Sequence, residues 1–120
     1  MTEGEVARLA RAGTASWGEV GDSADAPELA PATDEFLKAL ASPSRQKVML
    51  LFARGQELSV GEVADLAGLG QSTASEQLAF LRRGGILTSR RQGKVVRYRA
   101  NRDGVVRALD DLRAYLLACC

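Results

Sequence analysis

The chain has 120 residues, of which 46% are hydrophobic and 26% are charged. This length fits a single domain, and the composition is ordinary for a globular protein. The sequence contains no run of eighteen apolar residues, and its first residues do not resemble a secretory signal. We therefore expect a cytoplasmic protein without a membrane span. Its two cysteines, Cys119 and Cys120, are adjacent, so they do not provide a disulfide framework.

The net charge of +1 conceals an uneven distribution of charge along the chain. Residues 1–35 carry eight acidic and two basic side chains, whereas residues 36–120 carry seven acidic and fourteen basic ones. Such asymmetry indicates a basic domain that meets a polyanion, with an acidic tail attached. The alternative is a solvated surface whose charges are merely uneven.

Residues 1–31 are rich in Ala, Gly, Ser, Asp and Glu and have no sustained apolar face. A segment with so little to bury does not offset the entropy cost of ordering its backbone. We therefore predict that residues 1–31 form a disordered acidic arm, and that residues 32–120 form the folded domain.

Four helices are predicted in the first part of that domain. Apolar spacing predicts the first over residues 33–41, and Ser42-Pro43 begins a second that ends at Gly55. Ser59 and Glu62 form a capping box at the start of a third helix, whose inner face we assign to Val63, Leu66 and Ala67. The fourth is predicted from about Ser72 to Arg83, with Gly84-Gly85 after it.

The hydrophobic period then changes from that of a helix to that of a strand. Residues 86–91 and 94–99 are predicted to form two strands joined at Gln92-Gly93. Asn101 caps a last helix over residues 102–118. The predicted fold is therefore mainly α with a two-stranded β-hairpin, in the order ααααββα. The last helix repeats apolar residues by four, three and four, which predicts packing against a partner helix through Val105, Leu109, Leu112 and Leu116.

Two short helices joined by a tight turn and followed by a basic hairpin are typical of DNA-binding proteins. In such a pair the second helix enters the major groove, and its N-terminal residues meet the base edges. Gln pairs with adenine, and Ser or Thr reaches bases or phosphates. The alternative is that Ser72 is only a helix cap and the other residues are a solvated face. The predicted DNA-contacting residues of this helix are Gln71, Ser72, Thr73, Ser75 and Gln77.

The hairpin favours DNA over the alternative. The stretch from Arg82 to Arg102 contains eight basic residues and no acidic one. Arg90, Arg91 and Lys94 flank the turn, where they are placed to contact a phosphate backbone or a minor groove. Tyr98 is predicted to lie in the core, not to stack on a base.

The sequence resembles the ArsR/SmtB group of winged helix-turn-helix transcriptional regulators. The resemblance covers residues 36–118 and rests on four helical motifs and on the wing. The motifs are Leu40–Arg45, Glu57–Val63, Gln71–Leu78, Leu81–Leu87 and Arg90–Lys94 with Tyr98.

This resemblance implies a homodimer, formed through the first and last helices, that binds an inverted-repeat operator on double-stranded DNA and is released by an effector. The predicted dimer interface combines the seam of the last helix with three residues of the first helix, Phe36, Leu37 and Leu40.

The sequence departs from the family at its familiar sensing sites. Ser59 and Gly61 occupy the positions at which arsenic- and cadmium-type members carry cysteines, and the chain has no histidine. The last helix begins Asp103-Gly104-Val105, without the expected imidazole ligand, and Gln77 replaces the usual histidine of the recognition helix. The effector is therefore left open between a partner protein and a divalent metal at a non-standard site. The candidate metal ligands are Cys119, Cys120, Asp103 and Asp110.

An enzyme is not expected, because the sequence lacks histidine, an activated-nucleophile arrangement and a phosphate-cradling loop. A second function remains open at this point. The basic hairpin is also compatible with a protein-interaction module that binds an acidic partner, with DNA contact secondary.

Overall fold

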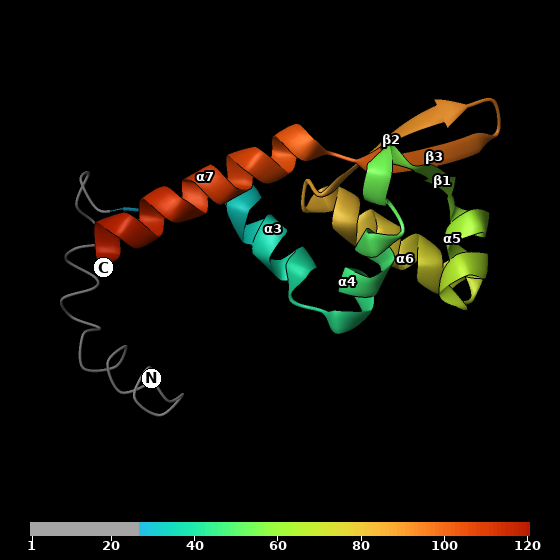
Figure 1. The fold of residues 1–120 in the computed structure, drawn as a ribbon, viewed down its shortest axis with the longest axis horizontal. Helices are drawn as coiled ribbons and strands as arrows, with labels where there is room; N and C mark the ends of the chain where they lie inside the picture. The colour runs from blue at the N-terminus through green and yellow to red at the C-terminus, as the bar shows by residue number, and fades with distance from the viewer. Residues whose placement is uncertain (1–26) are drawn as a thin grey trace.

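The computed structural model describes residues 27–120, and the first 26 residues of the predicted acidic arm lie outside that range. Figure 1 shows a helical body with a β-hairpin at one end and a long helix that extends toward the other. The elements follow the order predicted for the folded domain, and the described residues add one short strand and one 3₁₀ turn. Their bounds are α3 Pro31–Leu40, α4 Pro43–Leu50, η1 Ala53–Gly55, β1 Glu57–Ser59, α5 Val60–Ala67, α6 Gln71–Arg83, β2 Leu87–Gln92, β3 Val95–Ala100 and α7 Arg102–Cys119.

Local capping signals fix most of the helix starts. Ser42 accepts a hydrogen bond from the backbone N–H of Arg45 at 3.3 Å, and Pro43 follows as the first residue of α4. Ser59 and Glu62 form the reciprocal capping box of α5. Asn101 accepts a bond from the N–H of Gly104 and begins α7. These three predictions are confirmed.

Two helix boundaries differ from the prediction. Pro31, which we assigned to the end of the arm, is the first residue of α3, where its missing N–H has no intrahelical partner to lose. Helix α4 ends at Leu50, and the chain reaches Gly55 through a turn and a 3₁₀ segment. The prediction therefore placed the end of this helix, at Gly55, too late.

The wing is part of a three-stranded antiparallel sheet of order β1-β3-β2. The short strand β1 pairs with β3 so that Leu58 lies opposite Tyr98, and Ser89 of β2 lies on the other side of Tyr98. Tyr98 is 9% exposed and belongs to the core, as predicted. The hairpin turn consists of Gly93 and Lys94, one residue later than predicted, and Gly93 has a φ of 64°.

The core lies where α3, α4, α5, α6 and the sheet meet. Helix α6 contributes Ala74, Leu78 and Leu81, which are fully buried and spaced along one face. The prediction for α5 was partly wrong. Val63 is buried, but Leu66 and Ala67 are exposed, and Ala64 takes the second inner position.

Candidate nucleic-acid interface

The N-terminal turns of α6 present four of the five predicted recognition residues to solvent. Gln71, Ser72, Thr73 and Ser75 are exposed, while the intervening Ala74 is buried and holds this end of the helix against the core. Gly70 is the N-cap, and its helix start has no side-chain cap. Ser72 is the second helical residue, so the alternative that it serves only as a cap is wrong.

Gln77, the fifth predicted recognition residue, is positioned differently. Its side chain is half-buried, and its Nε2 donates a hydrogen bond to Ser44 Oγ at 3.3 Å, at the start of α4. Its Oε1 is buried and has no hydrogen-bond partner among residues 27–120. The structure therefore places the Gln77 amide between α6 and α4, apart from the four exposed side chains.

Two ion pairs attach the hairpin to the elements before it. Arg90 Nη2 lies 2.6 Å from Glu57 Oε1 of β1, and Arg97 Nη1 lies 3.2 Å from Glu62 Oε1 of α5. Arg97 also donates to Gln92 Oε1 at 3.0 Å, across the hairpin. Arg90, which we predicted as a DNA contact, is thus held by a carboxylate, and it differs in this from Arg91 and Lys94.

The capping box and the second ion pair share one carboxylate. Glu62 accepts hydrogen bonds from the Ser59 backbone N–H and from Arg97, and it lies beside the Ser59 hydroxyl. The bonds from Ser59 and then the Arg97 charge hold the pKa of Glu62 below its ordinary value of 4.5. The start of α5 is therefore fixed to the wing by a carboxylate that stays ionised at neutral pH.

Arg91 and Lys94 form no ion pair within the described part of the chain. Both are exposed, Arg91 on β2 and Lys94 in the turn. Their charges are therefore available to a polyanion. The charge of Arg90 is available only if a polyanion competes with Glu57 for it. Sequence reasoning did not single out Glu57 or Ser44, because their partners are 33 residues away in the chain.

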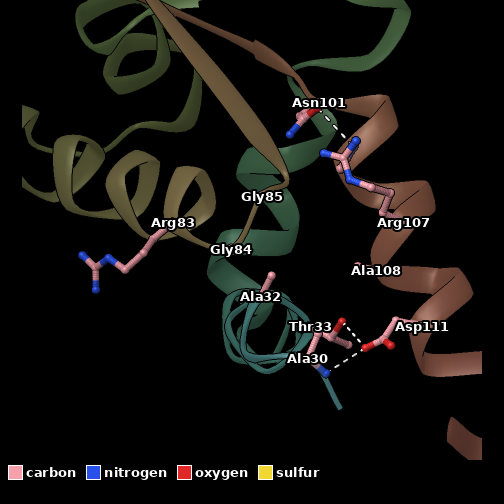
Figure 2. Close-up of a pocket in the computed structure, with 11 residues that line it drawn as sticks. Ala30, Ala32, Thr33, Arg83, Gly84, Gly85, Asn101, Arg107, Ala108 and Asp111 are labelled. Atoms are coloured by element: carbon pink, nitrogen blue, oxygen red, sulfur yellow. Dashed lines mark hydrogen bonds between the residues drawn. The ribbon is translucent and has the colours of Figure 1, made fainter. Parts of the chain in front are cut away.

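The second predicted surface, along α3 and α7, is held together by a carboxylate clamp. Asp111 Oδ2 accepts hydrogen bonds from Thr33 Oγ1 at 2.6 Å and from the Ala30 N–H at 3.0 Å, as Figure 2 shows. These bonds, that of Thr33 first, lower the pKa of Asp111 from its ordinary value of 3.8. The clamp joins the start of α3 to the middle of α7.

The predicted interface residues fall into three groups by their exposure to solvent. Phe36 is 3% exposed and packs in the chain's own core, so it has no surface to offer a partner. Leu109 and Leu116 are 49% and 48% exposed on α7. The remaining four are half-buried: Leu37, Leu40 and Val105 pack against the core, and Leu112 lies on α7 between the two exposed leucines in sequence.

The candidate metal ligands do not form a cluster of three or more in residues 27–120. Among these residues, no group of three or more His, Cys, Asp or Glu side chains is placed to hold one ion. Cys119 and Cys120 are exposed, with their Sγ atoms 2.9 Å apart, and the contact with Cys120 raises the pKa of the Cys119 thiol. Asp103 and Asp110 are exposed on α7.

None of the helices described is long and apolar enough to cross a membrane.

Comparison with known proteins identifies the fold and the family. A family model for a helix-turn-helix domain matches residues 40–90. The biofilm growth-associated repressor of Agrobacterium fabrum is 39% identical over 83 residues, which cover 69% of this chain and 70% of the repressor. The arsenic resistance transcriptional regulator ArsR1 of Pseudomonas putida is 45% identical over 62 residues, which cover 52% of this chain and 48% of that regulator.

Solved structures agree with these relatives. The solution structure of a homodimeric winged helix-turn-helix DNA-binding domain from Mycobacterium bovis, a possible ArsR-family transcriptional regulator, has 31% identity and a TM-score of 0.56. It covers 72% of this chain, which in turn covers 74% of it. Reduced HlyU from Vibrio cholerae has 30% identity and a TM-score of 0.54, over 70% of this chain and 88% of that one. The chain belongs to the ArsR family of winged helix-turn-helix transcriptional regulators, which bind DNA and are not enzymes.

Proposed function

We propose that this regulator binds an inverted-repeat operator as a homodimer in the cytoplasm, and that an effector controls its binding. One α6 from each subunit enters a major groove, and the turn of each wing lies against the phosphate backbone. The observation that carries this proposal is the exposed, uncharged start of α6 together with the exposed cations of the hairpin.

The two surfaces have different roles in this proposal. Gln71, Ser72, Thr73 and Ser75 offer amide and hydroxyl groups that read base edges. Arg91 and Lys94 neutralise phosphates and position the protein without reading sequence. Arg90 contributes charge to the wing while its pairing with Glu57 links β2 to β1.

The homodimer is supported by the apolar stripe on α7 and by the homodimeric Mycobacterium bovis domain. A pair of exposed leucines on one helix is stabilised when it is covered by a second apolar surface. Two recognition helices related by a two-fold axis then meet half-sites about one helical turn apart.

The test is selection of a binding sequence from random duplexes, followed by fluorescence anisotropy and sedimentation of the complex. We expect an imperfect palindrome, two chains per duplex, and an affinity that falls steeply with salt as counterions are released. The matched controls are a single half-site and a scrambled duplex of equal length. Binding of one chain per duplex, or binding that does not respond to salt, would contradict the proposal.

A further inference from the structure

An apolar hollow of about 770 Å³ lies between the end of α4, the η1 turn and the first turns of α7. Its buried side chains are Phe52 and Ile86, and Val105 and Val106 of α7 line it as well. Pockets for small organic ligands have volumes of roughly 300–1,000 Å³ and mostly apolar walls. The hollow therefore has the size and the lining of a small-molecule site.

Among residues 27–120, the charged side chains that line this hollow are all of one sign. They are Arg54 and Arg102. Neither arginine forms an ion pair with any residue from 27 to 120. Both arginines are exposed, and guanidinium groups bind carboxylates with two parallel, charge-assisted hydrogen bonds. The complement of this lining is an apolar body that carries one anionic group.

The backbone at Arg54 supports the same conclusion. Arg54 has a φ of 65°, and it is the one residue other than glycine with a positive φ in the described range. This left-handed conformation is costly for a side chain such as arginine, and glycine or asparagine would adopt it more easily. Strained backbone of this kind concentrates at ligand-binding positions. A binding role for the Arg54 side chain accounts for an arginine at this position.

The hollow also touches the elements on which DNA binding depends. Ile86 directly precedes β2 of the wing, and its carbonyl accepts a hydrogen bond from the Asn101 N–H at 2.8 Å, at the start of α7. Val105 is half-buried on α7, the helix proposed to form the dimer. A ligand that fills the hollow therefore contacts both the base of the wing and the dimerisation helix.

We propose that this hollow binds a monocarboxylate with an apolar aliphatic body, held by Arg54 and Arg102, and that its binding releases the regulator from DNA. The regulatory half of this inference rests on the proposed function, whereas the binding half does not. The proposal also supplies an organic effector for a chain whose described residues hold no metal-binding cluster.

Octanoate and octan-1-ol are the probes, titrated calorimetrically into the full-length protein without DNA. They share an apolar chain and differ in charge. We expect one octanoate per chain, bound at least about tenfold more tightly than octan-1-ol, because one charge-assisted contact contributes on the order of a factor of ten or more.

The variant Arg54→Asn/Arg102→Gln should lose about tenfold in octanoate affinity and keep its affinity for octan-1-ol, since asparagine tolerates the left-handed backbone and the apolar walls are unchanged. The matched control is Arg113→Gln, an exposed arginine eleven residues further along α7 and outside the hollow. It should bind octanoate as the wild type does. Circular dichroism verifies that each variant is folded.

Equal affinity for the two probes, or unchanged octanoate binding in the double variant, would overturn the assignment of the arginines. Octanoate binding that disappears when a higher protein concentration drives dimerisation would show that a second copy of the chain covers the hollow. That result would also overturn the proposed ligand site.

Addition of octanoate to the protein–DNA complex tests the regulatory half, and we expect release in the wild type but not in the double variant. A complex that survives saturating octanoate refutes that half alone, because calorimetry on free protein does not depend on DNA.

Discussion

The two ends of the described molecule differ in what they expose to solvent. At the end with the hairpin, the start of α6 and the turn of the wing expose amides, hydroxyls and cations. Toward the other end, α7 extends past the body (Figure 1). This helix exposes Leu109 and Leu116. Polar and cationic groups suit a hydrated polyanion, whereas exposed leucines suit a second apolar surface. In the proposed function, DNA reading and subunit pairing therefore occupy separate surfaces, and substitutions on one surface should leave the role of the other intact.

The largest effect is expected from Leu109→Glu/Leu116→Glu on the exposed stripe of α7. Carboxylates at these positions oppose the association of two subunits. A monomer then binds only one half-site, and the loss of simultaneous binding to both half-sites lowers the affinity by roughly a factor of 100 or more. Light scattering should report a monomer, and anisotropy should report the lost affinity. Leu50→Glu is the control, since Leu50 is 75% exposed on α4, away from the stripe. A double variant that remains dimeric would refute the assignment of this surface.

At the other end, Gln71→Ala should reduce sequence preference more than affinity. A lost base contact costs about 1–3 kcal/mol of discrimination at one base pair and leaves binding to random DNA nearly unchanged. The measurement is a competition between the selected operator and single-base variants. Gln56→Ala, an exposed glutamine outside α6, is the matched control. If Gln71→Ala weakens all duplexes equally, Gln71 contacts the backbone and not a base.

The wing should show the opposite pattern. Arg91→Ala/Lys94→Ala is expected to weaken binding by roughly tenfold on operator and random duplexes alike, and to reduce the salt slope by roughly 2, or about 0.9 for each phosphate contact. Anisotropy over a salt series measures both quantities. Arg113→Ala removes a charge from α7 and should leave the slope unchanged. A change in base preference would show that the wing reads sequence.

The smallest effect concerns the clamp between α3 and α7. Because the folded-state pKa of Asp111 is lowered, its contribution to stability is fully present above the ordinary value of 3.8 and is lost as pH falls through the folded value. Asp111→Asn should therefore lower the Tm at pH 7, and the difference from wild type should shrink below pH 3.8. Asp110→Asn, which alters the exposed neighbour, should give no such difference. A difference in Tm between Asp111→Asn and wild type that does not change with pH would mean that the charge of Asp111 is irrelevant to the clamp.

The sequence by itself determined the features that depend on neighbouring residues. Helix starts at Pro43, Val60 and Arg102 follow from side chains that bond backbone groups within three residues. The change of hydrophobic period located the hairpin, and the run of bases identified the wing. The family resemblance, carried by the same local motifs, was confirmed, and with it the winged helix-turn-helix fold.

The tertiary structure decided what depends on residues far apart in the chain. The strand β1 has three residues and no pattern of its own, so only its pairing with β3 reveals it. Leu66 and Phe36 both fit the inner face of a helix, and packing alone exposes the first and buries the second. The same reason governs Arg90 and Gln77, which their places beside the hairpin turn and near the start of the recognition helix assigned to DNA. Glu57 and Ser44, each 33 residues away, engage these side chains because folding brings their partners within hydrogen-bonding distance.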